Sequence, residues 1–118
     1  MEHIYSFKDL RVWKKGIEIV KEAYLLSKIL PNEELYGLVS QMRRAAVSIP
    51  ANIAEGFRRK FNREQKRFLG IALGSCAELE THIIIAKELK YLNEDDTLII
   101  TELIDHSCGM LVNLIKSL

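Results

Sequence analysis

The chain has 118 residues, enough for one domain with a single hydrophobic core. Its 48% apolar and 28% charged residues exclude an intrinsically disordered chain. The net charge is only +1, but residues 1–67 hold 14 Lys or Arg against 8 Asp or Glu, whereas residues 68–118 hold 3 against 8. This sorting predicts a basic surface and an acidic surface, each either solvated or facing a partner.

The chain begins without the basic and apolar pattern of a signal peptide. No apolar run approaches the roughly 18 residues of a membrane span. Cys76 and Cys108 both fall in apolar helical contexts, which favours buried free thiols over a disulfide. We therefore expect a cytoplasmic protein with no membrane partner.

The periodicity is helical throughout, and the first helix is expected over about residues 8–29. Ser6 or Asp9 would cap it, and Pro31 would help to end it. The expected core-facing stripe steps by three and four residues, through Leu10, Trp13, Ile17, Val20 and Tyr24.

The second helix is expected from about residues 32–34 to Gly56, a natural C-terminal breaker. Pro50 lies inside it, removes one backbone donor and clashes with the carbonyl of Ala46, at a cost of about 3 kcal/mol. We therefore predict a kinked helix that tertiary packing restrains. Its expected stripe consists of Leu35, Leu38, Met42, Ala45 and Ile49.

The third helix is expected from about Asn62 to Lys90, with Asn62 and Gln65 resembling a capping box. The fourth is expected from Asn93, followed by acidic residues that suit a helix N-terminus, to Lys116. The expected stripe of the third helix is Leu69, Ala72, Cys76, Leu79, Ile83 and Ala86. Because the connections are short, we predict a single domain over residues 1–118, an all-α, antiparallel up-down four-helix bundle.

The third and fourth helices carry more apolar residues than one core requires. The surplus on the third is Phe68, Ile71, Leu73, Ile84, Ile85 and Leu89. The fourth has one stripe of Ile100, Ile104, Cys108, Leu111 and Ile115 and a second of Ile99, Leu103, Met110 and Leu114. A helix that is apolar on two faces needs a second burial partner, so we predict a homo-oligomer.

Gly70 and Gly74, followed by Ala77, place small residues on one side of the third helix. Each glycine costs about 1 kcal/mol relative to alanine in a soluble helix. Two explanations stay open. Another protomer's helix approaches this side closely, or the glycines relieve crowding inside the monomer's own core.

No sequence motif indicates a reaction. The spacing from Glu78 to His82 and from Glu102 to His106 differs from the Glu-x-x-His of di-iron bundles, and the other helices offer no glutamate on an apolar stripe. Glu78 and Glu80 are two apart and point in different directions on a helix. We therefore expect a non-enzymatic protein with no catalytic residue, no metal and no cofactor.

The strongest candidate site is a basic cluster with interleaved Phe57 and Phe61. It consists of Arg58, Arg59, Lys60, Arg63, Lys66 and Arg67, with Arg43 and Arg44 as further candidates. A cluster that spans a loop and a helix N-terminus presents cations and backbone N–H groups to phosphate. This pattern favours RNA or DNA binding. The alternatives are a solvated surface and a protein-interaction scaffold whose acidic second half attracts a basic partner.

Two longer runs carry a resemblance to a known family: YGLVSQMRRAAVSIPANIAEG over residues 36–56 and RFLGIALGSCAELET over residues 67–81. FKDLRVWKKG over residues 7–16 and LKYL over residues 89–92 agree with it. The sequence resembles, over about residues 5–115, the four-helix-bundle proteins of the bacterial 23S rRNA intervening-sequence family.

The resemblance implies a ring-like homopentamer and kinship with the accessory protein of diversity-generating retroelements, which binds nucleic acid and a reverse transcriptase. That relative is strongly basic, whereas this chain has a pI of about 7.8, so only the local cluster supports nucleic-acid binding here. By resemblance, the architectural positions are Pro50, Asn52 and Gly56 in the second helix and Gly74, Ser75, Glu78, Leu79 and Glu80 in the third.

Overall fold

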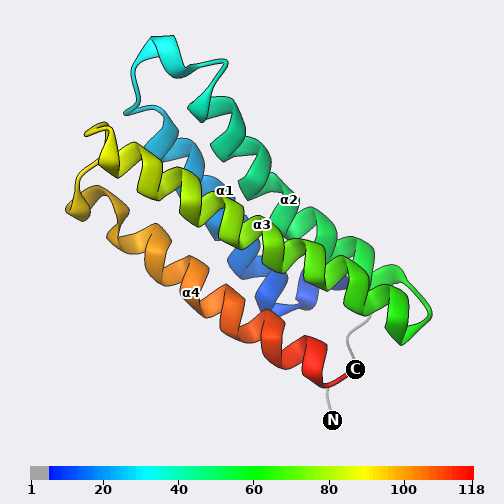
Figure 1. Cartoon of the computed structure of the whole chain (residues 1–118). Helices are drawn as coiled ribbons and strands as arrows, with labels where there is room; N and C mark the ends of the chain where they lie inside the picture. The colour runs from blue at the N-terminus through cyan, green and yellow to red at the C-terminus, as the bar shows by residue number, and fades with distance from the viewer. Residues whose placement is uncertain (1–5) are drawn as a thin grey trace.

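The computed structural model describes residues 6–118. Residues 1–5, which begin the N-terminal segment where we expect no signal peptide, lie outside the described residues. The described residues form α1 (Arg11–Ser27), α2 (Leu38–Arg58), α3 (Asn62–Glu88) and α4 (Glu94–Lys116), with short 3₁₀ helices η1 (Phe7–Asp9) and η2 (Asn32–Glu34). The α-helices lie side by side in an elongated bundle measuring 46 × 24 × 20 Å (Figure 1). The predicted all-α, four-helix fold is confirmed.

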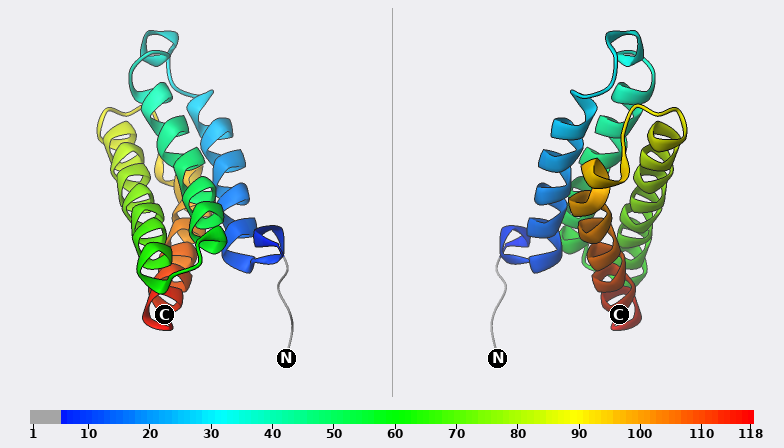
Figure 2. Two further views of the ribbon diagram at one scale, coloured as in Figure 1. Left: turned by 90° about the vertical axis from the view of Figure 1, so that its right-hand side faces the viewer. Right: turned by 90° about the vertical axis from the view of Figure 1, so that its left-hand side faces the viewer.

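Each helix packs on two others around one core: α1 and α3 both contact α2 and α4. The α2–α3 loop lies at one end of the bundle, and the α1–α2 and α3–α4 connections lie at the other (Figure 2). Every helix contributes fully buried side chains, including Ile19, Met42, Ile49, Ile53, Leu79, Ile100, Ile104 and Leu111.

The helix α2 passes through Pro50 without ending. Pro50 is buried against α1, and a Cβ added to Gly16 there would lie only 3.2 Å from the Pro50 Cβ. One turn of α2 is also tied across the proline, because Asn52 Nδ2 donates to the carbonyl oxygen of Ser48 at 2.8 Å and lies 2.9 Å from Ser48 Oγ. Packing and a side-chain hydrogen bond thus restrain the helix around Pro50, while the kink stays a prediction.

The prediction that Gly56 ends the second helix is wrong, because α2 continues to Arg58. Gly56 is buried where α2 meets α3. A Cβ added there would lie 3.3 Å from both the carbonyl oxygen of Gln65 and the Cβ of Phe68. The glycine therefore permits a close approach of two helices rather than terminating one.

The predicted core-facing stripe of the first helix is correct only in part, because Leu10, Trp13 and Val20 pack against the core but no residue of the stripe is fully buried. The buried residues of α1 are Val12, Gly16, Ile19, Ala23, Leu26 and Ser27. The predicted stripe lies on the neighbouring face, where Trp13 and Val20 are half-buried and Tyr24 is 39% exposed. The small residues Gly16 and Ala23 bring α1 close to its neighbours, so α1 turns this narrow face inward.

The helix caps follow the predictions only in part. Ser6 caps η1 rather than α1, since its Oγ accepts from the Lys8 N–H at 3.2 Å. The capping box expected at Asn62 is wrong, because Phe61 is the N-cap of α3 and Gln65 donates to the Arg59 carbonyl at 2.8 Å. The predicted start of α4 at Asn93 is confirmed, and the structure adds that Asn93 forms a capping box with Asp96.

By length and composition alone, α3 and α4 are long and apolar enough to cross a membrane, although neither is one continuous apolar run. Both nevertheless supply a buried stripe to the core, and all six residues predicted for α3 are buried. Of the surplus apolar residues predicted there, Ile71, Ile84, Ile85, Leu89 and Ile99 are exposed. The others are half-buried, and Leu73, Leu103, Met110 and Leu114 pack against the core, so the predicted second stripe of α4 is mostly wrong.

We predict opposite effects for alanine at two helical glycines. Gly56→Ala should lower the free energy of unfolding by about 1–3 kcal/mol, because its Cβ meets backbone and core atoms. Gly109→Ala should raise it by about 1 kcal/mol, because nothing lies within 4 Å of that Cβ and alanine favours the helix. Urea unfolding of both variants tests this, and a stabilised Gly56→Ala variant would contradict the close contact.

Candidate nucleic-acid interface

The structure brings the six predicted cations of the basic cluster to one end of the bundle. Arg58 ends α2, Arg59 and Lys60 lie in the connecting loop, and the other three occupy the first two turns of α3. All six residues are exposed. The carboxyl end of α4 lies nearby, as Asn62 Nδ2 donates to the Leu118 oxygen at 3.4 Å.

Three arginines of the cluster rest on aromatic rings. The guanidinium carbon of Arg59 lies 4.7 Å from the Phe68 ring centroid, and that of Arg67 lies 5.5 Å from the same centroid. Arg58 lies 5.4 Å from the ring centroid of Phe7. Arg59 also forms a 2.9 Å ion pair with Glu55. These contacts hold the guanidinium groups in place and neutralise part of the charge.

The other three cations, Lys60, Arg63 and Lys66, take no part in the ion pairs and cation–π contacts of the described residues. Phe61 lies among them in the sequence and is 68% exposed. Its position as N-cap of α3 supplies no side-chain hydrogen bond to the first turn. The loop and the first turns of α3 therefore offer a ligand three cations, an exposed aromatic ring and the uncapped N–H groups of the helix.

Arg43 and Arg44 do not join the cluster, because they precede Arg58 by four turns of α2, about 20 Å along the helix. Arg43 is half-buried and engaged with α1. Its Nε donates to Ser27 Oγ at 3.0 Å, and its guanidinium lies 4.7 Å from the Tyr24 ring centroid. Arg43 therefore ties α2 to α1, while Arg44 remains exposed.

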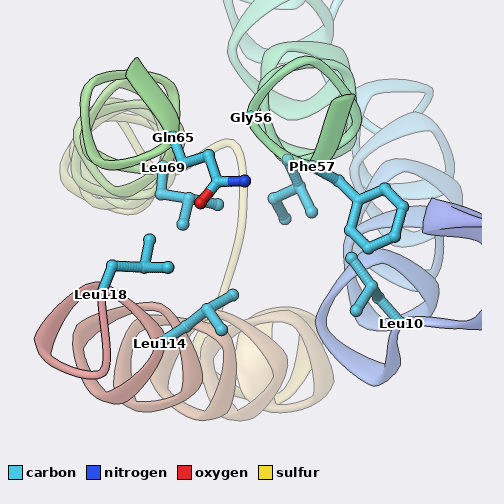
Figure 3. A pocket seen from close by; sticks show the side chains of 8 residues that line it. Leu10, Gly56, Phe57, Gln65, Leu69, Leu114 and Leu118 are labelled. Atoms are coloured by element: carbon cyan, nitrogen blue, oxygen red, sulfur yellow. The ribbon is translucent and has the colours of Figure 1, made fainter. Parts of the chain in front are cut away.

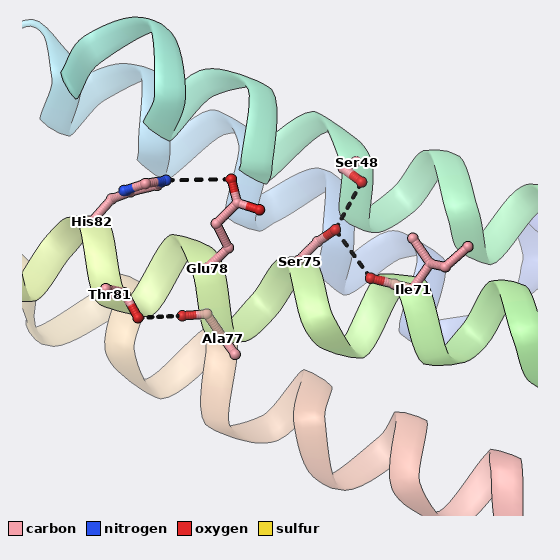
Figure 4. A network of polar contacts seen from close by, with 7 residues as sticks. All are labelled: Ser48, Ile71, Ser75, Ala77, Glu78, Thr81 and His82. Carbon is pink, nitrogen blue, oxygen red and sulfur yellow. Dashed lines mark hydrogen bonds and ion pairs between the residues drawn. The ribbon is translucent and has the colours of Figure 1, made fainter. Parts of the chain in front are cut away.

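The architectural positions suggested by the resemblance divide into inward and outward residues. Inward, the Ser48 and Ser75 hydroxyls lie 2.7 Å apart and link α2 to α3 (Figure 4). Outward, Gly74, Glu78 and Glu80 are exposed. Glu78 Oε1 lies 3.4 Å from His82 Nε2, and within the described residues no three His, Cys, Asp or Glu side chains form a group that holds a metal.

An apolar cavity of about 240 Å³ opens beside the cluster at this end of the bundle (Figure 3). Its lining consists of Leu10, Ile53, Gly56, Phe57, Gln65, Leu69, Leu114 and Leu118. The amide of Gln65 is already bonded to Arg59, so the walls offer contact area but no acid, base or nucleophile. Sequence reasoning missed this cavity because its walls come from four distant segments.

Both cysteines are free: Cys76 is buried in α3, and Cys108 is half-buried in α4. Burial and the neighbouring Cys108 thiol raise the pKa of Cys76 to about 12. Burial also raises the pKa of Cys108. The neutral thiols belong to the packing between α3 and α4 and lie outside the cluster.

Comparison with known proteins identifies a family and a solved structure of similar fold. The model of the 23S rRNA-intervening sequence protein family matches residues 8–113. A crystal structure of a protein with unknown function from the S23 ribosomal protein family of Bacteroides thetaiotaomicron is 25% identical, with a TM-score of 0.82. The match covers 89% of this chain and 98% of that one. No curated protein matches the sequence.

We predict that Cys76 resists alkylation in the folded protein. Since a raised pKa favours the neutral thiol, a pKa of about 12 leaves about a thousandfold less thiolate near pH 8 than the usual value of 9.0. In a Cys108→Ser variant, iodoacetamide should therefore label Cys76 at least about a hundredfold more slowly without urea than with it. Equal rates in the two conditions would show that the thiol is accessible.

Proposed function

The chain belongs to the 23S rRNA-intervening sequence protein family, and on this premise we propose that it is a non-enzymatic, homo-oligomeric protein that binds structured RNA or DNA. The observation that carries the proposal is that the cations of the basic cluster fall into two groups, one engaged within the protein and one not. Three arginines are held on aromatic rings, while Lys60, Arg63 and Lys66 are exposed and lie close in the sequence to an exposed Phe61.

Each part of the cluster has a role in this proposal. Lys60, Arg63 and Lys66 contact phosphates and release condensed counterions. Phe61 stacks on a base that is unpaired in a loop or bulge, since every base has a π-face. The uncapped first turn of α3 donates N–H groups to a phosphate. None of these contacts reads a base edge, so the proposal concerns structure rather than sequence.

Self-association strengthens this binding. We propose that the up-down bundle has antiparallel neighbours and, as the resemblance implies, assembles into a ring of five. The exposed apolar residues of α3 and α4 support an assembly. A ring repeats the cluster around its axis, so weak phosphate contacts add through multivalency.

The second candidate function is a protein-interaction scaffold, with a partner such as a reverse transcriptase. It draws on the acidic residues of α4, of which Glu94, Asp95, Glu102 and Asp105 are exposed and suit a basic partner. Recovery of one protein partner from a nuclease-treated pull-down would favour this candidate, and recovery of RNA alone would count against it.

We predict that Lys60→Glu/Lys66→Glu weakens binding to a structured RNA at least about tenfold near 50 mM salt and lowers the slope of log K against log salt by about 2. Fluorescence anisotropy measures both quantities. Arg44→Glu/Lys90→Glu makes the same charge change at two exposed positions away from the cluster and should weaken binding far less. Equal losses would indicate a net-charge effect, and no binding by the wild type would refute the proposal.

We also predict that Phe61→Ala weakens binding to a loop-containing RNA by about 1–3 kcal/mol, whereas Phe61→Trp retains it. The salt slope should not change, because no charge is lost. A fully paired duplex of the same length is the control, since it offers no unstacked base. An identical loss on loop and duplex would contradict the stacking role.

A further inference from the structure

The outward face of α3 is smooth and has no partner among the described residues. Gly70, Gly74, Ala77 and Thr81 follow one another at intervals of one turn, and all are exposed. A Cβ added to Gly70 or Gly74 would meet nothing within 4 Å. The explanation that these glycines relieve crowding inside the monomer is therefore wrong. They weaken the helix without any packing gain in the single chain.

Apolar side chains and carboxylates surround this smooth face. Ile71, Ile84 and Ile85 are 41%, 49% and 39% exposed. The hydroxyl of Thr81 donates to the Ala77 carbonyl at 2.8 Å, so the face presents no unsatisfied hydroxyl (Figure 4). Its charges are acidic, from the exposed Glu78 and Glu80. We call this surface, from Gly70 to Ile85, the α3 face.

A complementary surface lies across the bundle on α1, which is diagonal to α3 and does not contact it. It carries the exposed Tyr24 and the half-buried Ile17, whereas Trp13 and Val20 of the same stripe pack against the chain's own core. Lys14, Lys21 and Lys28 are exposed beside this stripe and recur every seven residues, about 10 Å apart. We call this surface the α1 face.

The charges of the two faces are opposite. The α1 face exposes Lys14, Lys21 and Lys28, whereas the α3 face exposes Glu78 and Glu80. A second copy of this chain is therefore the partner that suits both faces. Each copy brings a basic, bulky surface on one side and an acidic, smooth surface on the other.

We propose that the α3 face of one protomer packs on the α1 face of the next, with Gly70 and Gly74 admitting the exposed side chain of Tyr24. This inference rests on the self-association included in the proposed function and names its surfaces. Because the two faces differ and lie on opposite sides of the bundle, the contact is head to tail. Copies therefore close into a ring or extend as a filament, and they do not stop at a two-fold dimer.

The test uses two variants that each lose one face. Gly70→Gln/Gly74→Gln blocks the α3 face and leaves the α1 face intact, while Lys14→Glu/Lys21→Glu does the converse. Sedimentation velocity without nucleic acid should show an assembly for the wild type and a monomer for each variant alone. An equimolar mixture of the two variants should form a species of twice the chain mass and nothing larger, since each partner retains only one working face.

The matched control is Gly109→Gln. Gly109 is an equally open glycine, but it lies in the groove between α1 and α4, so this variant should keep the wild-type mass. Circular dichroism checks that each variant is folded. Because glutamine favours a helix more than glycine does, we expect the double-Gln variant to keep its helical content even when it is monomeric.

The inference would be overturned by a monomeric wild type or by unaltered assembly of the double-Gln variant. It would also be overturned if Lys14→Glu/Lys21→Glu alone formed dimers, because such dimers would mean that two α3 faces pair with each other. Neither face includes Lys60, Arg63 or Lys66. A wild type that assembles but does not bind RNA would refute the nucleic-acid proposal alone, and one that binds RNA as a monomer would refute this contact alone.

Discussion

The close approach of α2 to both of its neighbours is the constraint on which the rest of the bundle depends. On one side, Gly16 of α1 lies against Pro50, and on the other, Gly56 lies against the first turns of α3. A side chain at either glycine would push a helix outward. This spacing lets a proline remain in the middle of a buried helix, and it also fixes where the chain leaves α2 and enters the basic loop.

The helices that the sequence predicts well are those with purely local signals. The buried stripe of α3 follows from the spacing of its apolar residues, and the start of α4 follows from Asn93, a residue type that suits an N-cap. The face of α1 and the role of Gly56 could not be found in this way. Each depends on which helix comes close, and periodicity cannot distinguish two adjacent apolar stripes or a helix-ending glycine from one at a contact.

The candidate site also has one part that the sequence predicts and another that it does not. Its cations are neighbours in the sequence, so their clustering is predictable. Which of them are engaged is not, because Phe7 and Phe68 reach the arginines from segments outside the loop. Arg43 has the right charge and the wrong position, since Tyr24 and Ser27 already bind it. Only tertiary structure separates cations that maintain the bundle from those left for a ligand.

The sorting of charge has one more consequence once the fold is known. The basic loop around Lys60 and the acidic start of α4 at Glu94 and Asp95 lie at opposite ends of α3, a helix of 27 residues and about 40 Å. A nearly neutral molecule with its charges separated in this way is a large electric dipole. In the field of a polyanion such a dipole experiences a torque before contact. The torque turns the basic loop toward the polyanion and the start of α4 away from it. For the nucleic-acid binding that we propose, orientation therefore precedes contact, although the net charge gives almost no attraction.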